Sequence, residues 1–220
     1  MTDASTGSRA SERGFDAVLF DLHGVLTSSP WAALAAVGTD DGSDQAAVLE
    51  LMLGDYATDT DHPWHRLERG EIPMAEYGMA VMKLAADAGM TLDFSKLRGF
   101  SDRIQVNQQV VDKVRSLRSA GYRTGLVTNN VKEMASGWRA LLPADELFEV
   151  VVDSSDVGVR KPNPAIFSIA LDRLGGVDPA RAIFLDDAPG NVEGARAAGL
   201  SAILVDDVDE ALVALDVLLG

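Results

Sequence analysis

The fold is decided by residues 15–27, FDAVLFDLHGVLT. The first six of these residues are mostly apolar, and they lead directly into a carboxylate, Asp21. A short continuous apolar run is typical of a strand that is buried on both faces, as in a parallel sheet. Gly24 lets the chain turn sharply soon afterwards without a side-chain clash. The stretch therefore predicts a buried strand with a candidate carboxylate nucleophile at its end.

Four further apolar runs follow along the chain, and each of them also ends in polar residues. They are Arg123–Val127 before Thr128, Glu149–Val152 before Asp153, Ala182–Leu185 before Asp186, and Ala202–Val205 before Asp206. Helical periodicity accompanies them over Gln108–Ala120, Pro164–Leu174, Asn191–Ala198 and Val208–Leu219. Strands that alternate with helices predict an α/β fold with a doubly wound, Rossmann-like parallel sheet.

The segment between the first strand and residue 105 has helical periodicity and no convincing strand. Helices are predicted over Ala32–Val37, Gln45–Tyr56 and Met74–Ala88. We therefore predict a core domain of residues 15–29 and 102–220, with a helical cap domain of residues 30–101 inserted after the first strand. In open α/β sheets the ligand crevice lies at the carboxyl ends of the strands, so this cap would cover it. Residues 1–14 are polar and are expected to form a disordered tail.

Composition narrows the classes of function. The 220 residues include no cysteine, which excludes disulfides, thiolate catalysis and cysteine-ligated zinc. The net charge of −15 argues against nucleic acid and anionic membranes as partners. No apolar run is long enough to cross a bilayer, and the N-terminus lacks the apolar middle of a secretory signal. We therefore expect a cytoplasmic protein, and a homodimer stays open.

Three further groups of polar residues follow predicted strands or stand before a helix. Thr128 and Asn129 offer a hydroxyl and backbone N–H groups that can hold phosphoryl oxygens. Lys161 stands beside Pro162 on a stiff segment, where a cation can balance a carboxylate and a phosphoryl group. Asp186 and Asp187 are adjacent acids that favour a hard cation such as Mg²⁺. Each group by itself also suits a turn or a helix cap.

The order of these residues resembles the four signature motifs of the haloacid dehalogenase superfamily. The motifs are carried by FDLHGVLTSSP from Phe20, LVTNN from Leu126, VGVRKPNPAIFSIALDRLG from Val157, and AIFLDDAPGNVEGARAAGL from Ala182. In addition, HRLERGEIPMAEY (residues 65–77) resembles the helical cap of one branch of that superfamily. This branch includes the phosphatase domain of soluble epoxide hydrolases and the glucose-1-phosphatase-like enzymes. The resemblance extends from Phe15 to the C-terminus.

This resemblance implies a Mg²⁺-dependent phosphatase that acts on a small phosphorylated metabolite. Asp21 would attack phosphorus and form an aspartyl-phosphate, and Lys161 would balance charge. The implied Mg²⁺ ligands are the Asp21 carboxylate, the backbone carbonyl of His23, Asp187, and Asp186 directly or through water. The implied phosphoryl ligands are Thr128 and the Asn129 backbone.

His23 departs from the pattern of the family's phosphatases, which carry at this position an Asp that serves as acid and base. Three hypotheses stay open. His23 takes over proton transfer, since imidazole titrates near neutrality. Alternatively, the enzyme cleaves a C–halogen, C–P or other bond. Cleavage of a C–P bond would need a cap lysine as a Schiff base, and Lys83 and Lys96 are the only cap lysines. In the third hypothesis the chain is weakly active or is a non-catalytic binding or regulatory protein.

Several residues of the predicted cap have roles that the sequence leaves undecided. Trp31 follows the first motif closely and is a candidate to face the site. His62, Trp64 and His65 are candidates to line a substrate pocket, although such residues more often pack or cap a helix. Three methionines at helical spacing are expected in the core: Met74, Met79 and Met82.

Overall fold

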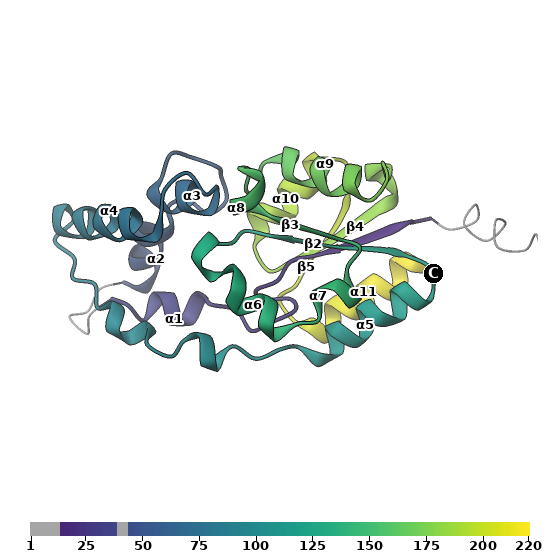
Figure 1. Ribbon diagram of the computed structural model, residues 1–220, viewed down its shortest axis with the longest axis horizontal. Coiled ribbons are helices and arrows are strands. Elements are labelled where there is room, and N and C mark those ends of the chain that lie inside the picture. Colours follow the sequence, from purple (N-terminus) through teal and green to yellow (C-terminus); the bar gives the residue numbers. More distant parts are fainter. Residues whose placement is uncertain (1–13, 39–43) are drawn as a thin grey trace, which may run out of the picture.

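The computed structural model describes residues 14–38 and 44–220 (Figure 1). The tail prediction therefore falls outside the described residues, apart from Gly14. One sheet of five parallel strands forms the centre, in the order β3-β2-β1-β4-β5. The strands are β1 (Ala17–Phe20), β2 (Arg123–Thr128), β3 (Val150–Asp153), β4 (Ala182–Asp186) and β5 (Ser201–Leu204). The predicted doubly wound parallel sheet is confirmed, and observed strand boundaries differ from the predicted ones by one or two residues.

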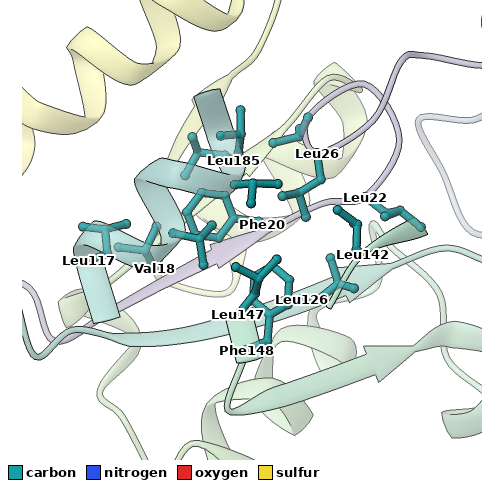
Figure 2. Packing of buried hydrophobic residues seen from close by; sticks show 14 of the residues in the cluster. Val18, Phe20, Leu22, Leu26, Leu117, Leu126, Leu142, Leu147, Phe148 and Leu185 are labelled. Atoms are coloured by element: carbon teal, nitrogen blue, oxygen red, sulfur yellow. The ribbon is translucent and has the colours of Figure 1, made fainter. Parts of the chain in front are cut away.

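Both faces of the sheet are covered because its central strand is apolar at every position. Val18 and Phe20 pack into one hydrophobic cluster (Figure 2), and Ala17 and Leu19 pack into another on the opposite face. All four side chains are fully buried. The helices of the first face are α5 (Gln108–Ser119), α7 (Ala144–Leu147) and α11 (Val208–Leu219), and those of the second are α9 (Pro164–Arg173) and α10 (Pro189–Ala197). This alternation is the reason that the continuous apolar run identifies a central parallel strand.

We call residues 30–101 the helical insertion, and in its described part, residues 30–38 and 44–101, the named elements are helices and 3₁₀ turns. These are α1 (Trp31–Ala35), α2 (Gln45–Leu53), α3 (Pro63–Glu68), α4 (Met74–Asp87) and the 3₁₀ turn η1 (Phe94–Leu97). The insertion has its own cluster of buried residues, which includes Val48, Leu67 and Val81. The insertion lies beside the end of the sheet at which β1 ends (Figure 1).

The insertion differs from the sequence prediction in several details, among them helix α3, which was not predicted. Helix α2 ends at Leu53 rather than Tyr56, because Gly54 adopts a φ of 71° that ends the helix. The side chains of Met79 and Met82 are 70% and 47% exposed, so their prediction as core residues is wrong. Both lie on the outer side of α4, whose buried residues are Tyr77, Val81 and Ala85.

The remaining short elements connect the strands. They are η2 (Ser101–Arg103), η3 (Lys132–Met134), α6 (Ala135–Leu141), α8 (Ser154–Val157) and η4 (Pro179–Arg181). Helix α6 follows β2 and lies between the sheet and the insertion in Figure 1. Among the helices of the described residues, none has the length and apolar character that a bilayer-spanning segment requires.

Candidate active site

Three carboxylates meet where β1 and β4 end. Asp21 follows β1, Asp186 is the last residue of β4, and Asp187 comes next. The two strands are neighbours in register, with Phe20 opposite Leu185, and the backbone N–H of Asp21 donates to the Leu185 carbonyl at 2.9 Å. One ligand oxygen from each of the three acids lies within 4.8 Å of the others. The register of the sheet therefore brings together acids that are 165 residues apart in the chain.

Lys161 links two of these acids. Its Nζ lies 2.6 Å from Asp21 Oδ1 and 2.6 Å from Asp186 Oδ2, and its side chain is fully buried. The Asn129 side chain fixes the backbone of Lys161. Its Nδ2 donates to the Lys161 carbonyl at 3.0 Å, and its Oδ1 accepts from the Lys161 backbone N–H at 2.8 Å. Asn191 Nδ2 donates to both oxygens of Asp186 at 3.1 Å. The position of the ammonium group is therefore set by several contacts.

The cluster carries more negative than positive charge. Burial raises the pKa of Asp21, Asp186 and Asp187 to about 6, against the opposing effect of the Lys161 charge. Burial disfavours the charge of Lys161, but Asp186 and Asp21 outweigh burial and raise the pKa of its ammonium group. One lysine therefore stands against three acids, and a divalent cation would relieve the excess.

Asp187 is confined by two neighbours from the chain that follows β1. A Cβ on Gly24 would lie 2.0 Å from Asp187 Oδ2, and the φ of Gly24 is 81°. Trp31 Nε1 donates to the same oxygen, Asp187 Oδ2, at 3.0 Å. The Asp187 carboxylate is thus held directly against the turn that contains His23. Trp31 therefore faces the site, which was the role considered for it from the sequence.

His23 is partly buried beside the carboxylates. Its Nδ1 lies 3.0 Å from Thr27 Oγ1. The Thr27 hydroxyl also has the backbone carbonyls of Leu22 and Ser28 as acceptors, at 3.3 and 3.4 Å. Burial, together with the smaller effect of the Lys161 charge, lowers the pKa of His23 to about 4. The imidazole is therefore neutral at pH 7 in the free protein.

A small cavity of about 60 Å³ lies over the cluster. Its walls combine residues of the sheet ends with residues of the insertion: Asp21, His23, Pro30, Trp31, Leu34, Tyr56, Trp64, Glu68, Asn129, Asp187 and Asn191. Of the predicted site residues, Thr128, Lys161 and Asp186 are fully buried and do not line it. The predicted site residues thus lie together at the carboxyl ends of the strands. Four of them line the cavity: Asp21, His23, Asn129 and Asp187.

The aromatic residues of the insertion divide between two roles. Trp64 lines the cavity. His62 instead precedes α3 and accepts from the Trp64 N–H at 3.2 Å, which caps that helix. His65 is fully buried, and its Nδ1 accepts from the backbone N–H of Thr60 at 3.0 Å. The pocket role considered for the two histidines is therefore not supported, since neither lines this cavity.

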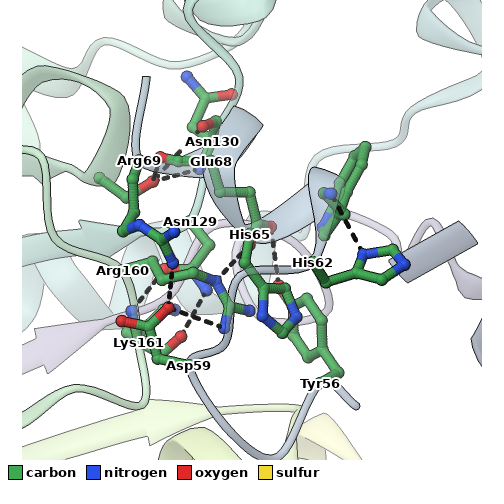
Figure 3. Close-up of polar contacts among 12 residues, drawn as sticks. Tyr56, Asp59, His62, His65, Glu68, Arg69, Asn129, Asn130, Arg160 and Lys161 are labelled. Carbon is green, nitrogen blue, oxygen red and sulfur yellow. Dashed lines mark hydrogen bonds and ion pairs between the residues drawn. The ribbon is translucent and has the colours of Figure 1, made fainter. Parts of the chain in front are cut away.

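Sequence reasoning missed a buried polar network that joins the insertion to the sheet (Figure 3). Arg160 Nε donates to Glu68 Oε2 at 2.6 Å, and the Tyr56 hydroxyl donates to Glu68 Oε1 at 3.2 Å. Arg160 Nη1 donates to the Thr58 carbonyl at 2.9 Å, and the guanidinium lies 4.9 Å from the centre of the Tyr56 ring. Because Arg160 directly precedes Lys161, this network places the insertion and the lysine together.

The comparisons with known proteins agree with this geometry. The sequence pattern of the haloacid dehalogenase-like hydrolase family matches residues 15–199. The chain is 31% identical over 215 residues to mouse acyl-CoA dehydrogenase family member 10, covering 94% of this chain and 19% of the relative. It is 29% identical over 217 residues to mouse bifunctional epoxide hydrolase 2, covering 91% and 38%. The chain therefore spans well under half the length of these two relatives.

Two further relatives are similar to this chain over most of the length of both proteins. A phosphoglycolate phosphatase from Colwellia psychrerythraea is 26% identical over 198 residues, which is 86% of this chain and 83% of the relative. A HAD family enzyme from Bacteroides thetaiotaomicron, solved with magnesium and inorganic phosphate, shares the fold with a TM-score of 0.59 at 20% identity. That alignment covers 90% of this chain and 98% of the other. Because the family pattern covers most of its length, this protein belongs to the haloacid dehalogenase-like hydrolases.

Proposed function

We propose that the protein is a Mg²⁺-dependent phosphatase that hydrolyses phosphate monoesters through an aspartyl-phosphate on Asp21. One observation carries the proposal: Lys161 bridges Asp21 and Asp186, and the half-buried Asp187 completes a group of three acids beneath a cavity. The names of two relatives, phosphoglycolate phosphatase and glyceraldehyde 3-phosphate phosphatase, support a phosphoryl substrate.

The residues present suit a magnesium ion. Asp21, Asp186 and Asp187 offer only oxygen, which a small hard cation prefers. A further oxygen is expected from the backbone carbonyl of His23, on the turn against which Asp187 packs. When bound, the ion would neutralise charge on the phosphoryl group and keep Asp21 deprotonated. The magnesium complex of the Bacteroides enzyme with the same fold supports this assignment.

The protein's own residues suit nucleophilic displacement at phosphorus. Asp21 Oδ attacks phosphorus, an O–P bond forms, and the ester O–P bond breaks to release the alcohol. Water then attacks the same phosphorus, the bond to Asp21 breaks, and inorganic phosphate leaves. Lys161 holds the Asp21 carboxylate in place and balances charge in both steps. The Asn129 backbone and the Thr128 hydroxyl are the proposed donors to the phosphoryl oxygens.

His23 is the proposed group for proton transfer. When the Thr27 hydroxyl donates to a backbone carbonyl, it accepts from His23 Nδ1–H, which leaves Nε2 as a proton acceptor. A phosphate dianion beside the ring favours the imidazolium, which can give its proton to the leaving oxygen. The neutral ring then takes a proton from the attacking water. One side chain would therefore serve both proton transfers, as the aspartate at this position does in the family's phosphatases.

The structure gives less support to the alternative chemistries. Lys83 Nζ is engaged by Asp87 at 2.6 Å on the exposed face of α4, and Lys96 Nζ donates to the Gly38 carbonyl at 2.7 Å. Neither lysine lines the cavity over Asp21, so a Schiff base for C–P cleavage has no candidate there. Three clustered acids favour a metal-dependent reaction over a dehalogenase.

Phosphate release from p-nitrophenyl phosphate tests the proposal. We expect turnover that requires both Mg²⁺ and Asp21, so that a chelator and the Asp21→Asn variant each abolish it. Asp206→Asn is the matched control, because Asp206 is an exposed acid that follows the neighbouring strand β5. Turnover that persists in Asp21→Asn, or its absence from the wild type with every phosphate monoester offered, would contradict the proposal.

A further inference from the structure

A second and much larger cavity continues from the first. Its volume is about 540 Å³, within the range of about 300–1,000 Å³ that is common for ligand pockets. The two cavities share wall residues, among them His23, Trp64 and Asn129. The space therefore begins at the proposed phosphoryl site and extends away from Asp21, between the helical insertion and α6.

The wall of this cavity is mainly apolar. Its apolar side chains come from both sides, namely Pro30, Leu34, Trp64, Leu97, Phe100, Ile104, Val131, Met134, Trp138 and Leu141. The wall also contains acids, and among the described residues that line it there is no lysine or arginine. Two of these acids already have partners: Glu68 binds Arg160, and Glu133 Oε1 accepts from the Met74 N–H at 2.9 Å. A bound molecule therefore meets apolar surface and negative charge.

We propose that this cavity receives the apolar alkyl or aryl alcohol portion of a phosphate monoester that carries no second anionic group. The inference rests on the proposed phosphatase function and specifies its substrate class. Burying one methylene contributes about 0.8 kcal/mol, which corresponds to about fourfold in affinity. A carboxylate in the same space would lose its water shell and would meet no lysine or arginine among the described residues that line the wall. Phosphoglycolate, the substrate in the name of the Colwellia relative, carries such a carboxylate.

Gly137 marks the position at which the cavity can be shortened. It lies in helix α6 and lines the cavity, and an added Cβ would meet no atom within 4 Å. A larger side chain there is compatible with the helix and has free space beside the cavity wall. Gly78 in helix α4 offers a matched control, since its Cβ position is equally free and it does not line the cavity.

Direct binding tests the inference without turnover. The Asp21→Asn variant, saturated with Mg²⁺, is titrated by calorimetry with alkyl phosphonates from methyl to octyl. We expect Kd to fall about fourfold per methylene over the first several carbons, and phosphonoacetate to bind more weakly than propyl phosphonate. Equal Kd values along the series, or preference for phosphonoacetate, would overturn the inference.

The glycine variants locate the effect. Gly137→Leu is expected to weaken octyl phosphonate at least tenfold while methyl phosphonate is unchanged, and Gly78→Leu should match the parent for both ligands. Loss of chain-length dependence in both variants, or in neither, would place the alkyl group elsewhere and contradict the assignment. These are binding measurements, so their result is independent of turnover. An absence of phosphate release would contradict the proposed function, whereas equal Kd values along the series would contradict only the substrate class.

Discussion

At the scale of single residues, the turn after β1 controls both the proposed metal and the proposed proton transfer. Asp21 and His23 were identifiable from the sequence because a carboxylate ends an apolar run and a glycine follows. The Asn129 side chain was not, since its amide binds the Lys161 backbone rather than a ligand. Trp31 could only be considered, because its contact with Asp187 joins positions 156 residues apart.

Gly24→Ala is expected to weaken the metal site. The variant introduces a side chain at a φ of 81°, and its Cβ would collide with the Asp187 carboxylate. Gly89→Ala is the control, since Gly89 has a φ of 68° with open space around it and therefore carries the backbone cost alone. We expect Gly89→Ala to lose about 1 kcal/mol of stability from its backbone, and Gly24→Ala to lose more than that because of the collision with Asp187. Only Gly24→Ala should lose the Mg²⁺-induced rise in Tm, and equal Mg²⁺ responses would contradict this account.

His23→Ala is expected to lower kcat by about 10²–10⁴, the usual contribution of acid–base catalysis. His23→Asp should recover much of that loss, because a carboxylate can transfer the same protons and the metal contact uses a backbone carbonyl. The measurement is steady-state hydrolysis of an alkyl phosphate, whose poor leaving group needs the proton. Wild-type turnover in His23→Ala would exclude the role, as would an aspartate variant no better than alanine.

At the scale of elements, the helical insertion is joined to the sheet by a buried ion pair. Its periodic helices α2 and α4 were predictable, whereas the short helix α3 (Pro63–Glu68) was missed despite proline in its first turn. The contact between Glu68 and Arg160 joins positions 92 residues apart, and no local pattern reports such a pair. The predicted boundaries of the two domains at residues 30 and 101 stay a prediction.

Glu68→Ala should destabilise the protein by about 3–5 kcal/mol, because it leaves the Arg160 guanidinium buried without its carboxylate. Lys83→Ala removes an exposed ion pair with Asp87 on α4 and should change stability by no more than about 0.5 kcal/mol. Urea unfolding measures both variants. Similar midpoints for the two would show that the buried pair does not hold the insertion.

At the scale of the whole molecule, stability depends on the three acids at the sheet edge. Each has a folded-state pKa of about 6, above the ordinary value of 3.8. A raised pKa means that their stabilising contribution is complete below about pH 4 and is lost as the pH rises through about 6. The proposed Mg²⁺ would bind the deprotonated acids and would offset that loss.

The Mg²⁺-induced rise in Tm should therefore be large at about pH 8 and should disappear as the pH falls through about 6. Calorimetry with Mg²⁺ and with a chelator measures the difference at each pH, which removes the contribution of histidines that titrate in the same range. Asp187→Asn should show a reduced rise at every pH. A rise of equal size at about pH 5 and pH 8 would be inconsistent with binding at these acids.

The central claim is that Asp21 carries the phosphoryl group. The most direct test is peptide mass spectrometry after acid quench of the His23→Ala variant with p-nitrophenyl phosphate and Mg²⁺. Nitrophenolate leaves without a proton, so the aspartyl-phosphate should form and then persist for lack of a base. The account predicts one phosphoryl group on Asp21 in this variant, and none in the double variant that also carries Asp21→Asn. Phosphate release with no covalent label, or a label on another residue, would contradict it.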